Sequence, residues 1–399
     1  MWFIWFMLVV YILLTAYTLW RSIHYIRRLS TKHDYKLICI IYGLLFIGCC
    51  STILLGGLLP YGAARIAIHK FSNYWLGFYV YIVFFTLVAD VLSLIVKLAY
   101  RGSSKYKKDI SVIARFTSIA VFALSISFTA YGLIHADNIF TSLYDLEVDK
   151  EAGSIDELDI VLIADLHLGY SIDADMLTQM VERVNDCNPD IILVAGDIID
   201  NEYEAMSDPD HIASILSSMK SKYGTYAVYG NHDVAEALIG GFSITPEEQA
   251  LRDPRVEAFM SKAGFTMLED DSVLIDDKFY IVGRLDGEKA GDGTNNRLET
   301  KELLAGLDKS RPVFLLSHEP DELAENAAAG VDMQLSGHTH AGQFFPLTVT
   351  SPLVWENSWG YLKVGNMHSL VTSGVGVYGP DMRVMTDSEI MHITVHFTR

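Results

Sequence analysis

Residues 191–200 read IILVAGDIID, and this stretch decides the fold. Its first half, Ile191–Ala195, has the length and the β-branched content of a strand, and it ends at Gly196-Asp197. A continuous apolar run is typical of a parallel strand that is covered on both faces. We therefore expect an α/β fold in which Asp197 lies in the loop at the carboxyl end of a central strand.

The same pattern recurs along the chain on both sides of this stretch. Helices are expected over Asp173–Cys187 and Ile212–Lys220. Further short strands are expected at Ile160–Ala164, Tyr226–Tyr229, Val313–Leu316 and Met333–Ser336. The motifs that follow these strands are, in order, Asp165-Leu166-His167, Gly230-Asn231-His232-Asp233, Ser317-His318 and Gly337-His338-Thr339-His340. Because α/β folds collect functional groups at the carboxyl ends of strands, these side chains are expected at one edge. Such oxygen and imidazole donors suit manganese, iron or zinc.

Together the motifs resemble the signature of the calcineurin-like metallophosphoesterases. The matching series is Asp165-x-His167, Gly196-Asp197-x-x-Asp200, Gly230-Asn231-His232-Asp233, His318 and Gly337-His338-x-His340. By themselves, Asp165-x-His167 and the Gly196-Asp197 loop are weak signals and Gly337-His338-x-His340 is moderately specific, but the complete series in this order is specific. The resemblance covers about Ile155 to Arg399 and is strongest, in the runs 336–343 and 373–383, to the bacterial membrane-associated branch. It implies a four-layer α/β/β/α sandwich.

The resemblance also implies a site for two divalent metal ions, with manganese expected and iron or zinc as alternatives. One ion would be held by Asp165, His167, Asp197 and His340, and the other by Asp197, Asn231, His318 and His338. Asp197 would bridge the two ions. A hydroxide formed between them would attack phosphorus in line with the leaving oxygen.

Two further residues are expected to be catalytic. His232 matches the family's non-ligand histidine beside the phosphate, and Asp200 matches the carboxylate that orients it. An imidazole fixed by a carboxylate favours its protonated form, which suits a general acid. For Gln343 and Arg383 two roles stay open, contact with the substrate or support of the fold.

The N-terminal third is predicted to cross a membrane. Its apolar stretches are Trp2–Trp20, Leu37–Leu59, Tyr74–Tyr100 and Ser111–His135. We expect a four-helix transmembrane domain over residues 1–136, a linker over 137–154 and the phosphoesterase domain over 155–399. Within the third stretch, we expect Lys97 to extend to the interface and Asp90 to bond a neighbouring helix, in preference to a role in transport.

Charge predicts the orientation of the chain in a cell membrane. Residues 1–149 carry 13 Lys and Arg against 7 Asp and Glu, whereas residues 150–399 carry 17 against 42. The segments after the first and third apolar stretches are strongly basic, and the other two are not. The positive-inside rule therefore predicts an extracytoplasmic N-terminus and phosphoesterase domain. The acidic surface disfavours nucleic acid as a partner.

The expected function is hydrolysis of a phosphate ester or pyrophosphate by a multi-pass membrane enzyme. Membrane lipids and a phosphorylated small molecule or lipid are the expected partners, and a lipid-linked or cell-envelope substrate is favoured because four helices exceed what tethering requires. The alternatives are a soluble or wall-bound phosphodiester, or a non-catalytic signalling protein that retains the fold. The aromatic residues Phe344, Phe345, Trp355 and Trp359 are expected in the core, or else in an apolar wall that receives a lipid.

Overall fold

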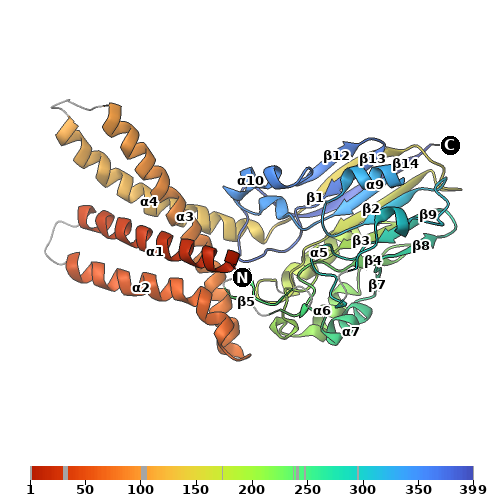
Figure 1. The fold of residues 1–399 in the computed structure, drawn as a ribbon, viewed down its shortest axis with the longest axis horizontal. Helices are drawn as coiled ribbons and strands as arrows, with labels where there is room; N and C mark the ends of the chain where they lie inside the picture. The colour runs from red at the N-terminus through yellow and green to blue at the C-terminus, as the bar shows by residue number, and fades with distance from the viewer. Residues whose placement is uncertain are drawn as a thin grey trace. The chain divides into compact units, whose positions relative to one another are not determined.

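The computed structural model describes residues 2–29, 35–99, 106–172, 174–236, 238–239, 242–246, 249–293 and 296–398. The chain divides into a helical unit and an α/β unit (Figure 1). The helical unit comprises Met1–Ile134 with the short segments Leu238–Ile244 and Gly379–Met382. The α/β unit comprises His135–Ala237, Thr245–Tyr378 and Arg383–Arg399.

Four long helices form the body of the helical unit. They are α1 (Trp2–Leu29), α2 (Tyr35–Leu55), α3 (Ala63–Ala99) and α4 (Tyr106–Ala136), with a 3-10 turn, η1 (Gly56–Leu58), after α2. All four are long and apolar enough to cross a membrane, as predicted. Helices α1 and α3 extend beyond the apolar stretches, because Arg and Lys are good helix formers and do not end a helix. Lys32, Arg101 and Lys105, which contribute to the basic segments, lie outside the described residues.

Asp90 on α3 has partners on α1. The Tyr17 hydroxyl donates to the Asp90 carboxylate over 2.7 Å, and Arg21 forms an ion pair with the same carboxylate. The expectation that Asp90 bonds a neighbouring helix is therefore confirmed. A charge within a membrane-spanning helix is costly unless it is paired, so this network favours one arrangement of α1 against α3.

The α/β unit contains two six-stranded sheets. The first has the order β1 (Ile139–Val148), β14 (Ser388–Phe397), β2 (Glu157–Ile163), β3 (Ile191–Ala195), β4 (Thr225–Val228) and β7 (Phe265–Met267). The second has the order β12 (Gly360–Val364), β13 (Met367–Val371), β11 (Met333–Ser336), β10 (Val313–Leu316), β9 (Phe279–Gly283) and β8 (Asp271–Ile275). Strands β2, β3, β4 and β7 are parallel, and so are β13, β11, β10 and β9. In the helical unit, β5 (Leu238–Ile239) pairs antiparallel with β6 (Phe242–Ser243).

Helices cover the outer faces of both sheets. The first sheet packs against α5 (Ala174–Asp186), α6 (Pro209–Leu216) and α7 (Pro254–Lys262), and the second against α8 (Thr300–Leu303) and α9 (Leu323–Ala329). Between the sheets, Leu162 of β2, Ile281 of β9 and Leu316 of β10 are fully buried in one core. The predicted four-layer α/β/β/α sandwich is therefore confirmed (Figure 1). The remaining elements are η2 (Tyr203–Ala205), η4 (His340–Gly342) and α10 (Leu347–Val354).

Strand β1 lies inside residues 137–154, where a linker was expected. It pairs in parallel with β14 along its whole length, from Ile139 opposite Ser388 to Val148 opposite Phe397. Since β1 is an edge strand that leaves Phe140 and Leu143 exposed, its residues do not show the alternation that identifies a strand in sequence. Helix α4 ends at Ala136, so only two residues separate a membrane-spanning helix from a strand of the sandwich.

Candidate metal centre

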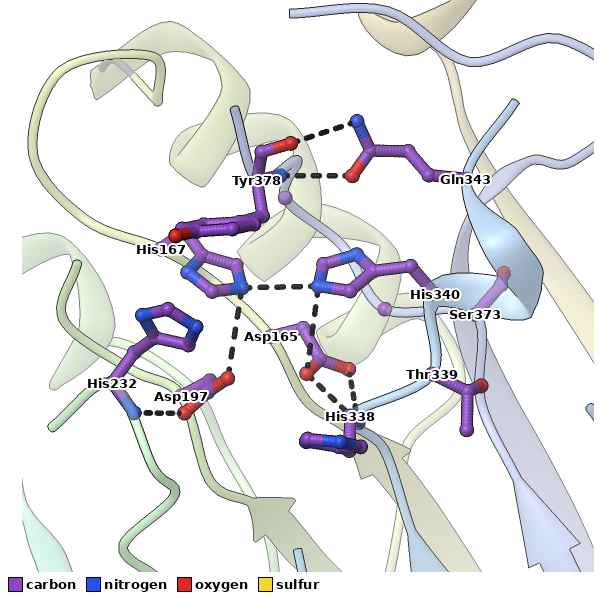
Figure 2. Close-up of polar contacts among 12 residues, drawn as sticks. Asp165, His167, Asp197, His232, His338, Thr339, His340, Gln343, Ser373 and Tyr378 are labelled. Atoms are coloured by element: carbon purple, nitrogen blue, oxygen red, sulfur yellow. Dashed lines mark hydrogen bonds and ion pairs between the residues drawn. The ribbon is translucent and has the colours of Figure 1, made fainter. Parts of the chain in front are cut away.

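The polar motifs lie at the carboxyl ends of parallel strands from both sheets. Asp165 and His167 follow β2, Asp197 follows β3, Asn231 and His232 follow β4, His318 follows β10, and His338 and His340 follow β11. Because the sheets pack face to face, these loops meet, and the structure brings together the residues that the sequence placed at the site. Figure 2 shows six of them, Asp165, His167, Asp197, His232, His338 and His340.

One cluster consists of Asp165, His167 and His340. One potential ligand atom from each lies within 4.8 Å of the others, and all three residues are buried. The Nε2 atoms of His167 and His340 face each other at 3.0 Å, and Asp165 Oδ1 lies 3.8 Å from the latter (Figure 2). Imidazole and carboxylate groups converging in this way form a donor set suited to a divalent cation.

A second cluster consists of Asp197, His318 and His338, again with ligand atoms within 4.8 Å of one another. The Asn231 Oδ1 atom lies 3.1 Å from His318 Nε2 and 3.1 Å from His338 Nδ1, so its amide oxygen joins this group. Asp197 Oδ2 lies 3.1 Å from His318 Nε2 and 3.8 Å from His167 Nε2. Asp197 therefore lies between the clusters, where one carboxylate can serve both.

The electrostatics of the clusters favour cation binding. Burial raises the pKa of Asp165 to about 6. Burial alone would raise the pKa of Asp197, but the attraction of His318 and His232 outweighs it and holds that pKa well below its usual value. Burial alone would lower the pKa of His318, but Asp197 raises it well above its usual value. Because a ligating imidazole must be neutral, cation binding here would release a proton from His318.

Five residues of the site adopt the left-handed backbone conformation that side chains disfavour. The φ angles are 53° at Asp165, 45° at His167, 50° at Asp197, 70° at His338 and 49° at His340. Each costs on the order of 1 kcal/mol, and such strain collects at functional sites, where the surrounding fold enforces it. The resulting tight turns let neighbouring residues of one loop, such as Asp165 and His167, direct their side chains into the same cluster.

Two glycines of the motifs allow the backbone to approach the carboxylates. A Cβ atom on Gly230 would lie 2.3 Å from Asp197 Oδ1, and one on Gly337 would lie 2.5 Å from Asp165 Oδ2. Such distances are far inside van der Waals contact. The glycines before Asn231 and His338 are therefore required by close packing against the carboxylates of Asp197 and Asp165.

The environment of His232 differs from the prediction. The Nδ1 atom of His232 lies 2.6 Å from Asn201 Oδ1 but 3.9 Å from Asp200 Oδ1. Asp200 Oδ1 lies at a similar distance, 3.8 Å, from His167 Nδ1. The Asn201 amide nitrogen donates to the Val234 carbonyl, which leaves Oδ1 to accept from His232. The orienting partner is thus a neutral amide instead of the predicted carboxylate Asp200.

The pKa of His232 shifts in the opposite direction to the prediction. Burial lowers it to about 4, and the attraction of Asp197 and Asp200 does not compensate. The imidazole is therefore neutral at pH 7, with its proton on Nδ1 and with Nε2 as an acceptor. The backbone N–H of His232 donates to Asp197 Oδ1 over 2.8 Å, which ties this histidine to the carboxylate between the clusters.

Asp233, the last residue of its motif, has a structural part that the sequence did not reveal. Its buried carboxylate accepts hydrogen bonds from the backbone N–H groups of Ile198 at 2.9 Å, Ile199 at 2.8 Å and Gly230 at 2.8 Å. Burial raises its pKa to about 7. Asp233 therefore links the loop of Asp197 to the loop of Asn231.

Tyr378 is a residue of the site that sequence reasoning missed. Its ring centroid lies 4.4 Å from that of His232 and 5.5 Å from that of His167 (Figure 2). Gln343 holds it through two hydrogen bonds to the Tyr378 backbone, at 2.9 Å to N–H and 3.1 Å to C=O. The signal available in the sequence is the glycine pattern around it, Gly374-x-Gly376-x-Tyr378, which is typical of close backbone approach.

Gln343 and Arg383, whose roles the sequence left open, both support the site. The fully buried Arg383 donates from Nη2 to the carbonyl oxygens of Ser373, Gly374 and Gly376. A Cβ atom on Gly374 would lie 2.7 Å from the Cβ atom of Asp165, so this loop packs directly behind the first cluster. Arg383 therefore fixes the backbone that supports Asp165.

The aromatic residues after the second histidine pair do not share one environment. Phe344 is buried, whereas Trp359 is 52% exposed and donates from Nε1 to Glu389. The Trp355 ring centroid lies 5.1 Å from that of His338, in an edge-on contact. The expected core position is therefore right for Phe344, and Trp355 lies beside the second cluster.

Known proteins share these features. The sequence profile described as calcineurin-like phosphoesterase matches residues 158–342. A transmembrane protein with metallophosphoesterase domain from Danio rerio is 31% identical over 337 residues, which cover 80% of this chain and 72% of that protein. An uncharacterized metallophosphoesterase from Aquifex aeolicus (strain VF5) is 29% identical over 269 residues, 67% of this chain and 95% of its own. The described residues include four helices apolar enough to cross a membrane and groups of side chains that could hold metal ions. By its similarity to these proteins, this chain belongs to the calcineurin-like phosphoesterases, a family of metal-dependent hydrolases.

Proposed function

We propose that the chain hydrolyses a phosphate ester or pyrophosphate at a pair of divalent cations held by the two clusters. The observation that carries this proposal is the position of Asp197, with one carboxylate oxygen 3.1 Å from His318 and 3.8 Å from His167. Asp165, His167 and His340 would hold one cation, Asn231, His318 and His338 the other, and Asp197 both. The mixed oxygen and nitrogen donors suit manganese, with iron or zinc as alternatives.

Bound cations would supply Lewis-acid activation of water and neutralise the charge of the phosphate. The remaining work falls to the chain's own residues. The His232 Nε2 atom is free of the Asn201 hydrogen bond, and a phosphate anion beside it would raise the pKa of the imidazole. His232 could then donate a proton to the leaving oxygen. The Tyr378 ring covers His232 and His167 and would limit the access of water to that proton.

For the substrate we propose a lipid-linked or cell-envelope phosphoester, and for the α/β unit an extracytoplasmic location. The support is the presence of four apolar helices and the uneven distribution of Lys and Arg around them. A soluble or wall-bound phosphodiester is the rival substrate. Cysteine-reactive reagents that do not cross membranes should label Lys222→Cys in intact cells, and protection of that position would refute the orientation.

The activity is tested with purified full-length protein and added manganese on a panel of phosphomonoesters, phosphodiesters and pyrophosphates. Asp197→Asn should abolish both activity and the binding of two cations, whereas His232→Ala should abolish activity and retain the cations. Lys301→Ala, at an exposed position on α8, is the matched control and should behave as wild type. Stoichiometric cation binding with no turnover on the whole panel would instead support the non-catalytic alternative.

A further inference from the structure

The segment after the second histidine pair is unlike the rest of the α/β unit. From Ala341 to Trp355 the sequence has no charged residue, although residues 150–399 are strongly acidic. Helix α10 lies in this segment and has no buried residue. Leu353 is 83% exposed and Val354 is 75% exposed. A surface helix normally turns polar side chains to water, so a helix that exposes its apolar ones marks an interaction surface.

Another exposed apolar side chain, Met385, lies near the end of the candidate membrane span of α4. Met385 is 72% exposed and has a φ angle of 67°, a conformation that side chains rarely adopt. The candidate span of α4 ends at Ala136, and its carbonyl accepts a hydrogen bond from Ser388 over 2.8 Å. Asp387 also contacts His135 over 2.7 Å. Three residues of chain reach at most about 11 Å, so Met385 lies close to Ala136, the last residue of α4.

Helix α10 begins beside the segment that carries Met385. The backbone N–H of Phe345 donates to the Val384 carbonyl over 3.0 Å, and the Thr386 hydroxyl donates to the Gln343 carbonyl. The residues just before α10 are therefore hydrogen-bonded to the residues on either side of Met385. At its other end α10 leads into Trp355, whose ring contacts His338 of the second cluster.

We propose that these exposed apolar residues form a membrane-contact surface that lies in the interface of the bilayer crossed by α1–α4. The surface consists of Leu347, Val349, Leu353, Val354 and Met385. Its occupant is phospholipid, because the α/β unit that carries it is covalently joined to α4 through β1, which begins two residues after that helix. An eight-residue helix is about 12 Å long and offers too little area for a stable dimer on its own.

A role of the membrane-contact surface in binding substrate rests on the proposed function. A lipid phosphoester held at α10 would have its phosphate near Trp355 and His338 while its acyl chains stay in the bilayer. Lipid substrates would then reach the metal centre without leaving the membrane.

The surface itself is tested without any activity measurement. Full-length protein with Cys39, Cys49, Cys50 and Cys187 replaced by Ser receives a single Leu353→Cys, is labelled with a fluorophore and is reconstituted in phospholipid vesicles. Spin-labelled phospholipid should quench this probe at least about threefold more than a probe at the control position Lys222→Cys, and aqueous iodide should show the reverse order. Lys222 precedes the amino end of β4. Ser388 begins β14, which runs antiparallel to β2 and pairs through Met391 with Leu162 near the carboxyl end of β2, so the control lies at the opposite end of the sheet.

Equal quenching of the two probes by lipid would overturn the proposal. Protection of the Leu353 probe from both quenchers would also overturn it, in favour of a second copy or another protein.

The delivery of substrate is tested separately with Leu353→Asp. Because the side chain is exposed, the variant should fold. Activity on a vesicle-borne lipid phosphoester should fall about tenfold relative to activity on a water-soluble phosphodiester, which corresponds to about 1.4 kcal/mol. An equal change on both substrates would refute delivery through this surface. No activity of wild type on either substrate would refute the proposed function, while the quenching result would still decide the surface.

Discussion

Asp233→Asn should loosen the metal centre without removing any ligand. In wild type one carboxylate oxygen accepts from Ile198 and Ile199 and the other from Gly230. An Asn side chain keeps the first oxygen and turns an NH2 group toward the Gly230 N–H, so one buried donor loses its acceptor. That loss costs about 1–3 kcal/mol. For a unit of this size, 2 kcal/mol corresponds to a fall in unfolding temperature of about 4–8 °C.

Cation affinity should fall as well, because Gly230 precedes the proposed ligand Asn231 and Ile198 follows the proposed ligand Asp197. Loss of such a support typically costs about 10–100-fold in affinity. The measurements are thermal unfolding and calorimetric manganese titration of the full-length chain at pH 8, above the pKa of about 7 that burial gives Asp233. Asp271→Asn is the matched control, because this exposed carboxylate at the start of β8 accepts from the backbone N–H of the adjacent Ser272 and does not join two loops. Wild-type affinity and unfolding temperature in Asp233→Asn would refute the view that this carboxylate joins the two loops.

Three other perturbations test individual side chains. Tyr378→Ala should lower kcat by about tenfold at unchanged metal content, while Tyr378→Phe stays near wild type, because the ring and not the hydroxyl covers His232. Equal losses in both would contradict this. Asn201→Asp places a carboxylate at the Nδ1 of His232 and should raise its pKa by about 1–2 units, read from the pH profile of kcat; an unmoved profile would contradict the assigned contact. Burial raises the pKa of Glu319 to about 8, so the folded protein keeps a proton that the unfolded chain releases above about pH 4.5. Stability should therefore fall as pH rises toward 8, and Glu319→Gln should flatten that fall in chemical denaturation with chelator present.

Much of the metal centre could be predicted from the order of residues along the chain. Short apolar runs such as Ile191–Ala195 and Val313–Leu316 specify parallel strands, and both appear with the predicted bounds. A polar residue directly after such a run must lie at the carboxyl end of its strand. The convergence of Asp165, Asp197 and His318 is therefore a consequence of local sequence and of the parallel arrangement.

The edge strand β1 of the first sheet could not be predicted from local sequence. β1 is half exposed and pairs with β14, a strand some 240 residues later in the chain, so neither carries a local signal of its partner. The same limit applies to Arg383, whose role depends on three carbonyl groups of a loop that only the folded chain places around it.

The sequence by itself thus determined which residues gather at the metal centre, because strand direction and strand ends are local properties. Only the tertiary structure decided what each gathered side chain touches. Asn201 contacts His232 where the adjacent Asp200 does not, and Tyr378 covers the same imidazole from a loop more than 140 residues away. The physical reason is that burial and contact distance depend on how loops from different strands pack. In His232 that burial outweighs the neighbouring carboxylates and sets its protonation.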